Sequence, residues 1–342
     1  MQTQIINSTP FVPIQFESVD QHLNHFGVIA VKGTFDIRQN QPLSVSREQR
    51  PPVLEDTYFG EPGRSSLRFD SCFAPWKPRT DIVVETSSYS PSGQPEAQWI
   101  AGLEIGPISK NFRVTGPRFW TRRLGVNRLT SIEPVHEVDV RYELAFGGST
   151  GSSADERYGE NPVGRGFRID TRNGDCACPQ ILPANVEQPV AGQFAAVEGL
   201  GPIAPSWESR LRFAGEFDEN WTVTQAPYLP QTFDYEFYNV APQGLKFPGF
   251  ARGDEVCRLT NLSPEHQLGF ALPGIELMTV IQFDDGRIIP GPINLDTIEL
   301  DIPSRIASLT WRGIFPAQIP TRRIEIRMSA PDSMIESRQG TH

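Results

Sequence analysis

The sequence predicts an all-β protein, mainly antiparallel, with a two-lobed β-sandwich-like architecture and a few short helices. Proline and glycine supply 31 and 29 of the 342 residues, and such a composition disfavours long helices and favours β structure rich in turns. Many segments alternate apolar and polar residues with the two-residue period of a half-buried strand. A hydrophobic content of 38% is enough for a substantial core.

The first lobe is expected to span residues 1–136. Apolar runs and alternating segments, separated by Pro and Gly turn signals, predict its strands. These strands are expected at 26–37, 81–87, 99–105 and 111–115. The run at 26–37 is apolar along most of its length, which predicts a strand in the core.

The second lobe is expected to span residues 137–342. The segment 138–146 places apolar residues at every second position, which predicts a half-buried strand central to this lobe. Two short helices are expected at 206–213 and 215–221. The last third predicts an antiparallel layer of short strands, with a tight hairpin turn at Asp285 and Gly286. These strands are expected at 276–283, 287–290, 297–302, 306–315 and 322–330.

Composition excludes several classes of protein. A formal net charge of −10 argues against a nucleic-acid partner, because phosphate binding usually depends on clustered positive charge. The first residues have no basic region followed by an apolar run, and no segment approaches about 18 consecutive apolar residues. We therefore expect a cytoplasmic protein with no membrane segment.

The four cysteines are expected to be free thiols in that compartment. Cys176 and Cys178 form a C-x-C pair that could hold a metal or form a redox pair. The pair lacks a second close cysteine pair or an adjacent histidine, so no metal or other cofactor is expected.

A glycine-rich loop at 161–167, with the sequence NPVGRGF, follows the predicted central strand. It combines backbone freedom with a fixed charge, and we select it as a candidate for partner binding or loop ordering. The candidate residues are Asn161, Gly164, Arg165, Gly166 and Phe167.

Two roles are open for Arg165. It could grip an anion together with Arg168 and Arg172, or it could form a buried structural pair with Asp155 or Glu160. The loop lacks the GxxxxGK[ST] pattern of a phosphate loop, and the chain has no GxSxG nucleophile elbow. These absences favour binding or ordering over catalysis.

A second candidate is the aromatic-rich segment 233–242, which belongs either to the core or to a contact surface. Its candidate residues are Phe233, Tyr235 and Phe237.

Several motifs together resemble a bacterial family of type VI secretion effector adaptors, classified as domain of unknown function twenty-one sixty-nine. The resemblance covers about 26–313, so one family unit includes both lobes. It is carried by RYELAFGG at 141–148, NPVGRGF at 161–167, KPRTDIVV at 77–84, GPISKNFRVTGPRFW at 106–120, WxxRLxxAG at 207–215 and FDxxFxNxAP at 233–242.

The resemblance implies a non-enzymatic cytosolic adaptor or chaperone. Such a protein binds a toxin effector, often one with a spike-tip domain, and helps load it onto the spike of the secretion apparatus. Two alternatives stay open. One is an enzyme that acts on an anionic substrate through Arg165 and nearby carboxylates, and the other is a structural component of the apparatus.

Overall fold

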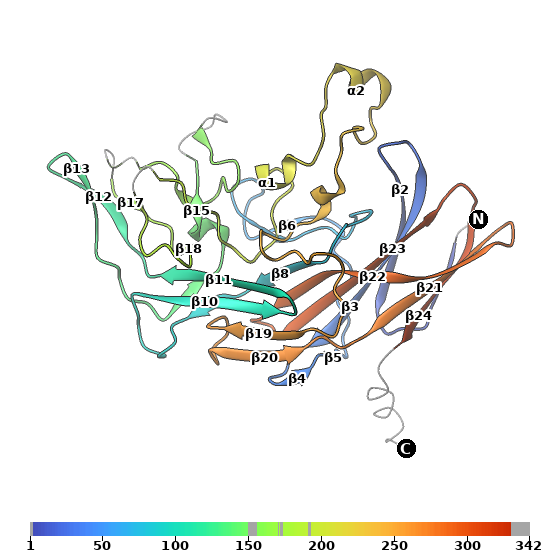
Figure 1. The fold of residues 1–342 in the computed structure, drawn as a ribbon, viewed down its shortest axis with the longest axis horizontal. Coiled ribbons are helices and arrows are strands. Elements are labelled where there is room, and N and C mark those ends of the chain that lie inside the picture. The colour runs from blue at the N-terminus through green and yellow to red at the C-terminus, as the bar shows by residue number, and fades with distance from the viewer. Residues whose placement is uncertain (1–2, 150–155, 170, 172–173, 191–192, 330–342) are drawn as a thin grey trace.

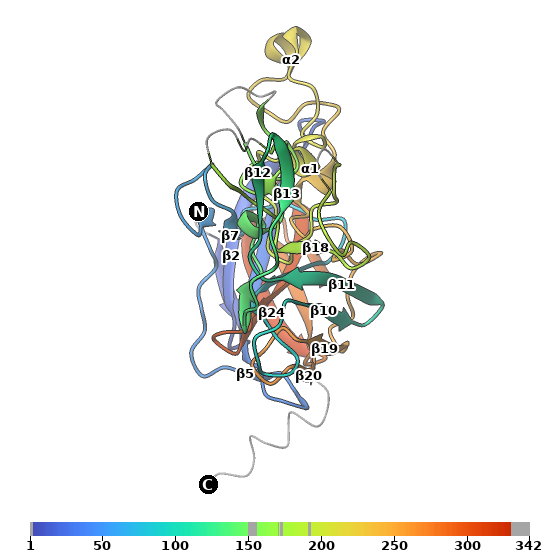
Figure 2. The same cartoon turned by 90° about the vertical axis from the view of Figure 1, so that its left-hand side faces the viewer.

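The computed structural model describes residues 3–149, 156–169, 171, 174–190 and 193–329. These residues form mostly β structure, as predicted, with two α-helices in the described ranges: α1 (Glu208–Leu211) and α2 (Glu219–Thr224). Figures 1 and 2 show α2 at the end of an arm that projects beyond the sheets. Nothing in the described part of the chain forms a helix with the length and apolar character needed to cross a bilayer.

The larger sheet has nine strands and is mainly antiparallel. Seven strands follow one another across it, β5 pairs with β3, and β8 pairs with β22. The pairs β1–β24 and β8–β22 are parallel. In spatial order the strands are β1 (Gln4–Asn7), β24 (Thr321–Ser329), β21 (Glu276–Phe283), β22 (Ile288–Asp301), β23 (Ile306–Pro316), β3 (His25–Asp36) and β2 (Val12–Val19), with β5 (Ser44–Val45) and β8 (Asp81–Glu85) beside them.

The second sheet has six strands and packs against the first (Figure 1). Its order is β18 (Ile181–Pro183), β11 (Ile108–Thr115), β10 (Gln98–Ile105), β19 (Val256–Thr260), β20 (Gln267–Ala271) and β4 (Gln41–Pro42). The remaining strands form small sheets: β12 (Phe119–Arg123) with β13 (Val126–Leu129) and β17 (Cys176–Ala177), β9 (Ser87–Tyr89) with β14 (Glu137–Asp139), β15 (Phe146–Gly147) with β16 (Arg165–Gly166), and β6 (Thr57–Tyr58) with β7 (Leu67–Phe69).

One continuous core lies between the two large sheets. It takes alternate residues from most strands, such as Val31 and Phe35 of β3 and Leu103 of β10, all of which are buried. Both sheets draw strands from either side of the expected boundary at 136/137, because β3 pairs with β23 and β10 pairs with β19. The segments 1–136 and 137–342 therefore share their sheets and their core.

Part of the opposite face of the larger sheet, over β3, β22 and β23, is polar and covered. Lys32 of β3, Ser308 of β23 and Asp301 of β22 point to this face, and all three are buried. Arg312 of β23 donates to Asp296 at 2.6 Å and to the Cys72 carbonyl at 2.9 Å. The second bond fixes the segment that contains Cys72 to the sheet.

The predicted strand at 138–146 is wrong in the middle. The chain forms β14, then the 3₁₀ helix η1 (Tyr142–Leu144), and then β15. Its burial alternates as expected through Val138, Val140 and Tyr142. Asn161, however, donates hydrogen bonds to the carbonyls of Tyr142 and Phe146. A buried side chain therefore takes acceptors that a neighbouring strand would have taken, and the backbone turns.

Other element boundaries also differ from the predictions. The strands expected at 287–290 and 297–302 are parts of one strand, β22, whose register with β23 shifts between Leu295 and Thr297. Helix α2 begins later than predicted because the Asp218 side chain accepts a hydrogen bond from the Trp221 N–H, which caps the helix there.

Candidate functional site

The glycine-rich loop (161–167) is built around a buried side chain, Asn161. Its Nδ2 lies 2.9 Å from the Tyr142 carbonyl oxygen and 3.0 Å from that of Phe146. Gly147 has a φ of +147°, and a Cβ on it would lie 2.1 Å from the Asn161 carbonyl oxygen. A Cβ on Gly164 would lie 2.5 Å from Asn161 Nδ2. The glycines are therefore needed because two backbone segments meet at this asparagine.

Arg165 holds the loop against the preceding segment. Its Nε donates to the Glu143 carbonyl at 2.8 Å, and its backbone N–H donates to the Ala145 carbonyl at 3.0 Å. Burial lowers the pKa of this half-buried guanidinium, and the nearby Glu143 opposes that shift. The predicted pair with Glu160 is wrong, since the Arg165 side chain turns to the Glu143 carbonyl instead. The alternatives that involve Asp155 and Arg172 lie outside the described residues.

Phe167 belongs to an aromatic cluster beside the loop. Its ring centre lies 5.2 Å from that of Tyr158 and 6.0 Å from that of Phe194, and Phe146 completes the group. Phe194 is 74% exposed. The aromatic cluster therefore extends from the buried side of the loop to the protein surface at Phe194.

The aromatic-rich segment 233–242 is anchored by a fully buried carboxylate, Asp81. The carboxylate accepts hydrogen bonds from the N–H groups of Val240 and Ala241 at 2.9 and 3.1 Å, and from Lys77 Nζ at 2.9 Å. Asn239 donates to the Arg79 carbonyl at 2.8 Å. These contacts hold two of the sequence motifs, 77–84 and 233–242, against each other.

Helix α1 connects the two candidate segments. The Glu208 N–H donates to the Gly159 carbonyl, just before the glycine-rich loop. On the other side, Arg210 donates to the Phe237 carbonyl at 2.9 Å and to Asp70 at 3.2 Å. Both predicted segments thus contact α1, but their candidate side chains do not form one site.

The three candidate aromatic residues divide between core and surface. Phe233 is buried, and Phe237 lies under the Arg210 guanidinium at 5.0 Å. Tyr235 reaches an open groove of about 620 Å³, where its ring centre lies 5.2 Å from that of Trp76. Burial raises the pKa of Tyr235 to about 12, so its hydroxyl stays protonated at neutral pH.

We call this depression the aromatic groove. It lies between the β2–β3 turn, the end of β23 and the 3₁₀ helix η3 (Tyr235–Tyr238). Ile314 projects into it with 53% of its surface exposed, and Trp76 is 36% exposed. Gln225, at the end of α2, donates to the Gln21 carbonyl and so fixes the projecting arm beside the groove. The lining includes Asp20, His22, His25, Phe26, Phe315 and Pro316.

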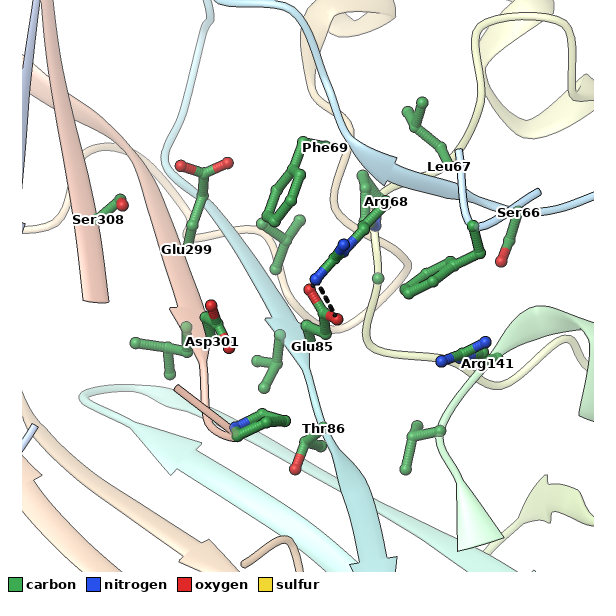
Figure 3. A pocket seen from close by; sticks show the side chains of 18 of the residues that line it. Ser66, Leu67, Arg68, Phe69, Glu85, Thr86, Arg141, Glu299, Asp301 and Ser308 are labelled. Atoms are coloured by element: carbon green, nitrogen blue, oxygen red, sulfur yellow. Dashed lines mark hydrogen bonds and ion pairs between the residues drawn. The ribbon is translucent and has the colours of Figure 1, made fainter. Parts of the chain in front are cut away.

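A second, deeper depression lies over the polar face of the larger sheet (Figure 3). We call it the arginine-lined cavity, and its volume is about 350 Å³. In Figure 3 Arg68 reaches toward Glu85 near the centre, with Asp301 and Arg141 to either side. Glu85 and Asp301 are register partners at the ends of the parallel strands β8 and β22, so the sheet itself brings the two carboxylates together.

The charges in this cavity are arranged as ion pairs. Lys32 Nζ lies 2.8 Å from Glu299, Arg50 lies 2.9 Å from Asp301, and Arg68 lies 3.0 Å from Glu85. Arg141 is held more loosely, 3.6 Å from Asp139, with its guanidinium carbon 4.2 Å from the centre of the Phe59 ring. Such a cavity can bind a polar ligand on an apolar floor.

The sequence did not point to this cavity, because its residues come from segments between 32 and 308. Arg50 and Asp301, for example, are 251 residues apart. The sequence held one signal for the cavity, the alternation of polar and apolar residues at 297–301. In the structure the polar face of this strand is buried.

The C-x-C pair sits at the edge of β17. Cys178 is buried, and burial raises the pKa of its thiol to about 11. No disulfide joins the four cysteines, all of which lie in described segments. Across the same segments, no group of three or more His, Cys, Asp or Glu side chains is placed to hold a metal ion.

The comparisons with known proteins agree with the resemblance at the level of the family. The model of the family described as "Uncharacterized protein conserved in bacteria (DUF2169)" matches residues 22–312. The chain belongs to this family. The matched range agrees with the predicted unit of about 26–313 and includes strands of both large sheets. Strands β1, β2 and β24 of the larger sheet lie outside it. No curated protein and no solved structure matches the chain.

Proposed function

We propose that this protein is a non-enzymatic adaptor that binds a type VI secretion toxin effector in the cytoplasm and aids its loading onto the spike. The observation that carries the proposal is the aromatic groove. Its exposed Trp76 and Ile314 and half-buried Tyr235 offer the aromatic and aliphatic anchors that are common at the centres of protein interfaces. The motif resemblance to effector adaptors supplies the kind of partner.

The anchoring of the groove supports this function. Tyr235 lies on a segment that Asp81 and Arg210 fix from two sides. A preorganised surface loses less conformational entropy on binding than a mobile one. The same contacts join the segments 77–84 and 233–242.

The test is a pull-down with the toxin encoded beside this gene, using purified, folded protein. Ile314→Glu places a charge in the groove and is expected to abolish retention of the toxin. Ile288→Glu is the matched control, because Ile288 is 57% exposed and does not line the groove. Retention of the toxin by the Ile314→Glu variant, or no retention by the unaltered protein, would overturn the proposal.

The two alternatives make different predictions. A structural component of the apparatus would be stoichiometric in purified spike particles, whereas an adaptor should be absent or substoichiometric there. An enzyme that depends on Arg165 would lose turnover on Arg165→Ala while keeping its stability. The hydrogen bond from Arg165 to the Glu143 carbonyl favours an ordering role for this residue.

A further inference from the structure

The arginine-lined cavity is separate from the aromatic groove, and its charges are distributed unevenly with depth. Four cations face four anions, but in two pairs the arginine is the more exposed member. The exposed side-chain fraction is 41% for Arg50 against 11% for Asp301, and 44% for Arg68 against 21% for Glu85. These two arginines therefore lie nearer the mouth than their carboxylates. Asp139, the partner of Arg141, is 51% exposed and also lies near the mouth. The charged lining is Lys32, Arg50, Arg68 and Arg141 with Glu85, Asp139, Glu299 and Asp301.

Arg141 is the cation most available to a ligand. Its side chain is 41% exposed and lies 3.6 Å from Asp139, beyond hydrogen-bonding distance. Its guanidinium is oriented by the Phe59 ring, 4.2 Å away. A guanidinium offers five N–H donors in a planar fork that matches a carboxylate. Arg68 uses its Nε and one terminal nitrogen on Glu85, which leaves its other terminal nitrogen for a ligand.

The walls between these charges are apolar. Val53, Val83, Val140 and Pro202 line the cavity, and its volume of about 350 Å³ suits a small ligand. Each exposed arginine is already partly neutralised by its own carboxylate. A doubly charged anion such as phosphate would therefore meet repulsion from Asp139 and from the deeper carboxylates, whereas a single negative charge would meet less.

We propose that this cavity binds a ligand with one carboxylate on an apolar body the size of an aromatic side chain, its carboxylate held by Arg141 and Arg68. A free organic acid and an acidic side chain beside an aromatic residue in a protein segment share this chemistry. The binding is independent of the adaptor role, since the cavity and the groove have no lining residue in common.

The first experiment uses the unaltered protein and compares 3-phenylpropionate with its neutral analogue 3-phenylpropionamide in NMR titrations. The acid is expected to bind about tenfold more tightly or better, because a charge-assisted hydrogen bond is lost in the amide. Equal binding of acid and amide, no binding of the acid at millimolar concentration, or tighter binding of inorganic phosphate would each overturn the proposal.

Variants locate the site. Arg141→Gln is expected to weaken binding of the acid about tenfold, and Arg141→Lys, which keeps the charge, is expected to restore part of it. Arg252→Gln is the matched control, because Arg252 is 80% exposed and pairs with Asp254 outside the cavity. Thermal unfolding checks that each variant is folded. Equal affinity in the folded Arg141→Gln variant would place the binding elsewhere and overturn the assignment.

A third arm separates the two sources of the carboxylate. A short capped peptide with glutamate beside phenylalanine is compared with its glutamine analogue. Charge-dependent binding of the peptide with the same loss on Arg141→Gln supports a protein segment as the ligand. Charge-dependent binding of the free acid alone supports a small organic acid.

Discussion

Asp81 shows how one side chain can determine the position of a whole segment. It is fully buried, pairs with Lys77 and accepts the N–H groups of Val240 and Ala241. Burial by itself would lower the pKa of Lys77, but the nearby Asp81, Asp296 and Asp70 carboxylates outweigh it and raise that pKa. A lysine whose pKa is raised on folding contributes stability below its unfolded pKa and loses it only in strongly alkaline solution.

Asp81→Asn is therefore expected to destabilise the protein by about 3 kcal/mol, because it removes the charge opposite a buried lysine. The loss should be nearly constant between about pH 6 and pH 9, where the Lys77 contribution does not titrate. Urea unfolding measures it. Asp254→Asn, at an exposed ion pair, should stay within about 0.5 kcal/mol of the unaltered protein. Similar values for the two variants would contradict the anchoring role.

Arg165 makes a second prediction for a single side chain. Arg165→Ala removes the hydrogen bond to the Glu143 carbonyl, and we expect a loss of about 1–3 kcal/mol in the free energy of unfolding. Differential scanning calorimetry should show a lower melting temperature. Arg64→Ala provides the comparison, since the Arg64 side chain is 82% exposed. An unchanged melting temperature for Arg165→Ala would favour a ligand-binding role.

Among the elements, strands were predicted best where the segment is long and both neighbours are strands. Both β3 and β23 are buried along most of their length. The run at 26–37 corresponds to β3, and 306–315 corresponds to β23. The prediction failed at 142–145, because Asn161 takes the carbonyls of Tyr142 and Phe146. A hydrogen bond from a distant side chain leaves no periodic signal in the sequence of the segment that accepts it.

The packing of the glycine-rich loop against β15 can be tested through its glycines. Gly147→Ala is expected to cost several kcal/mol, because its Cβ would lie 2.1 Å from the Asn161 carbonyl oxygen and its φ is positive. Gly249→Ala is the matched control, since a Cβ there meets nothing within 4 Å. Chemical denaturation of both variants distinguishes them, and equal stability would mean that the two segments are not closely packed.

For the molecule as a whole, the sequence predicted the fold class and the family but not the candidate binding cavity. Alternation at 297–301 assigned Ile298 and Leu300 to one face and Glu299 and Asp301 to the other. It could not show that the chain from 46 to 77 would cover the polar face, because that depends on pairs such as Arg50 with Asp301. Of the candidate residues, Tyr235 lines the aromatic groove. Asn161 and Arg165 order the loop.

The shared core predicts that the protein unfolds as one unit. Circular dichroism and tryptophan fluorescence should give coincident urea transitions, since Trp99 of β10 and Trp311 of β23 are buried in the same core. The fragment 137–342 should not fold alone, because it lacks β3, β8 and β10. Two separated transitions, or a folded fragment, would instead support two independent lobes.

The pairing of β3 with β23 also affects how the protein is made. On the ribosome β3 emerges early, but its neighbour β23 is complete only at Pro316. At ordinary rates of synthesis this interval is on the order of tens of seconds. During that time one edge of an apolar strand has no native partner, so the nascent chain is exposed to edge-to-edge association until β23 is complete.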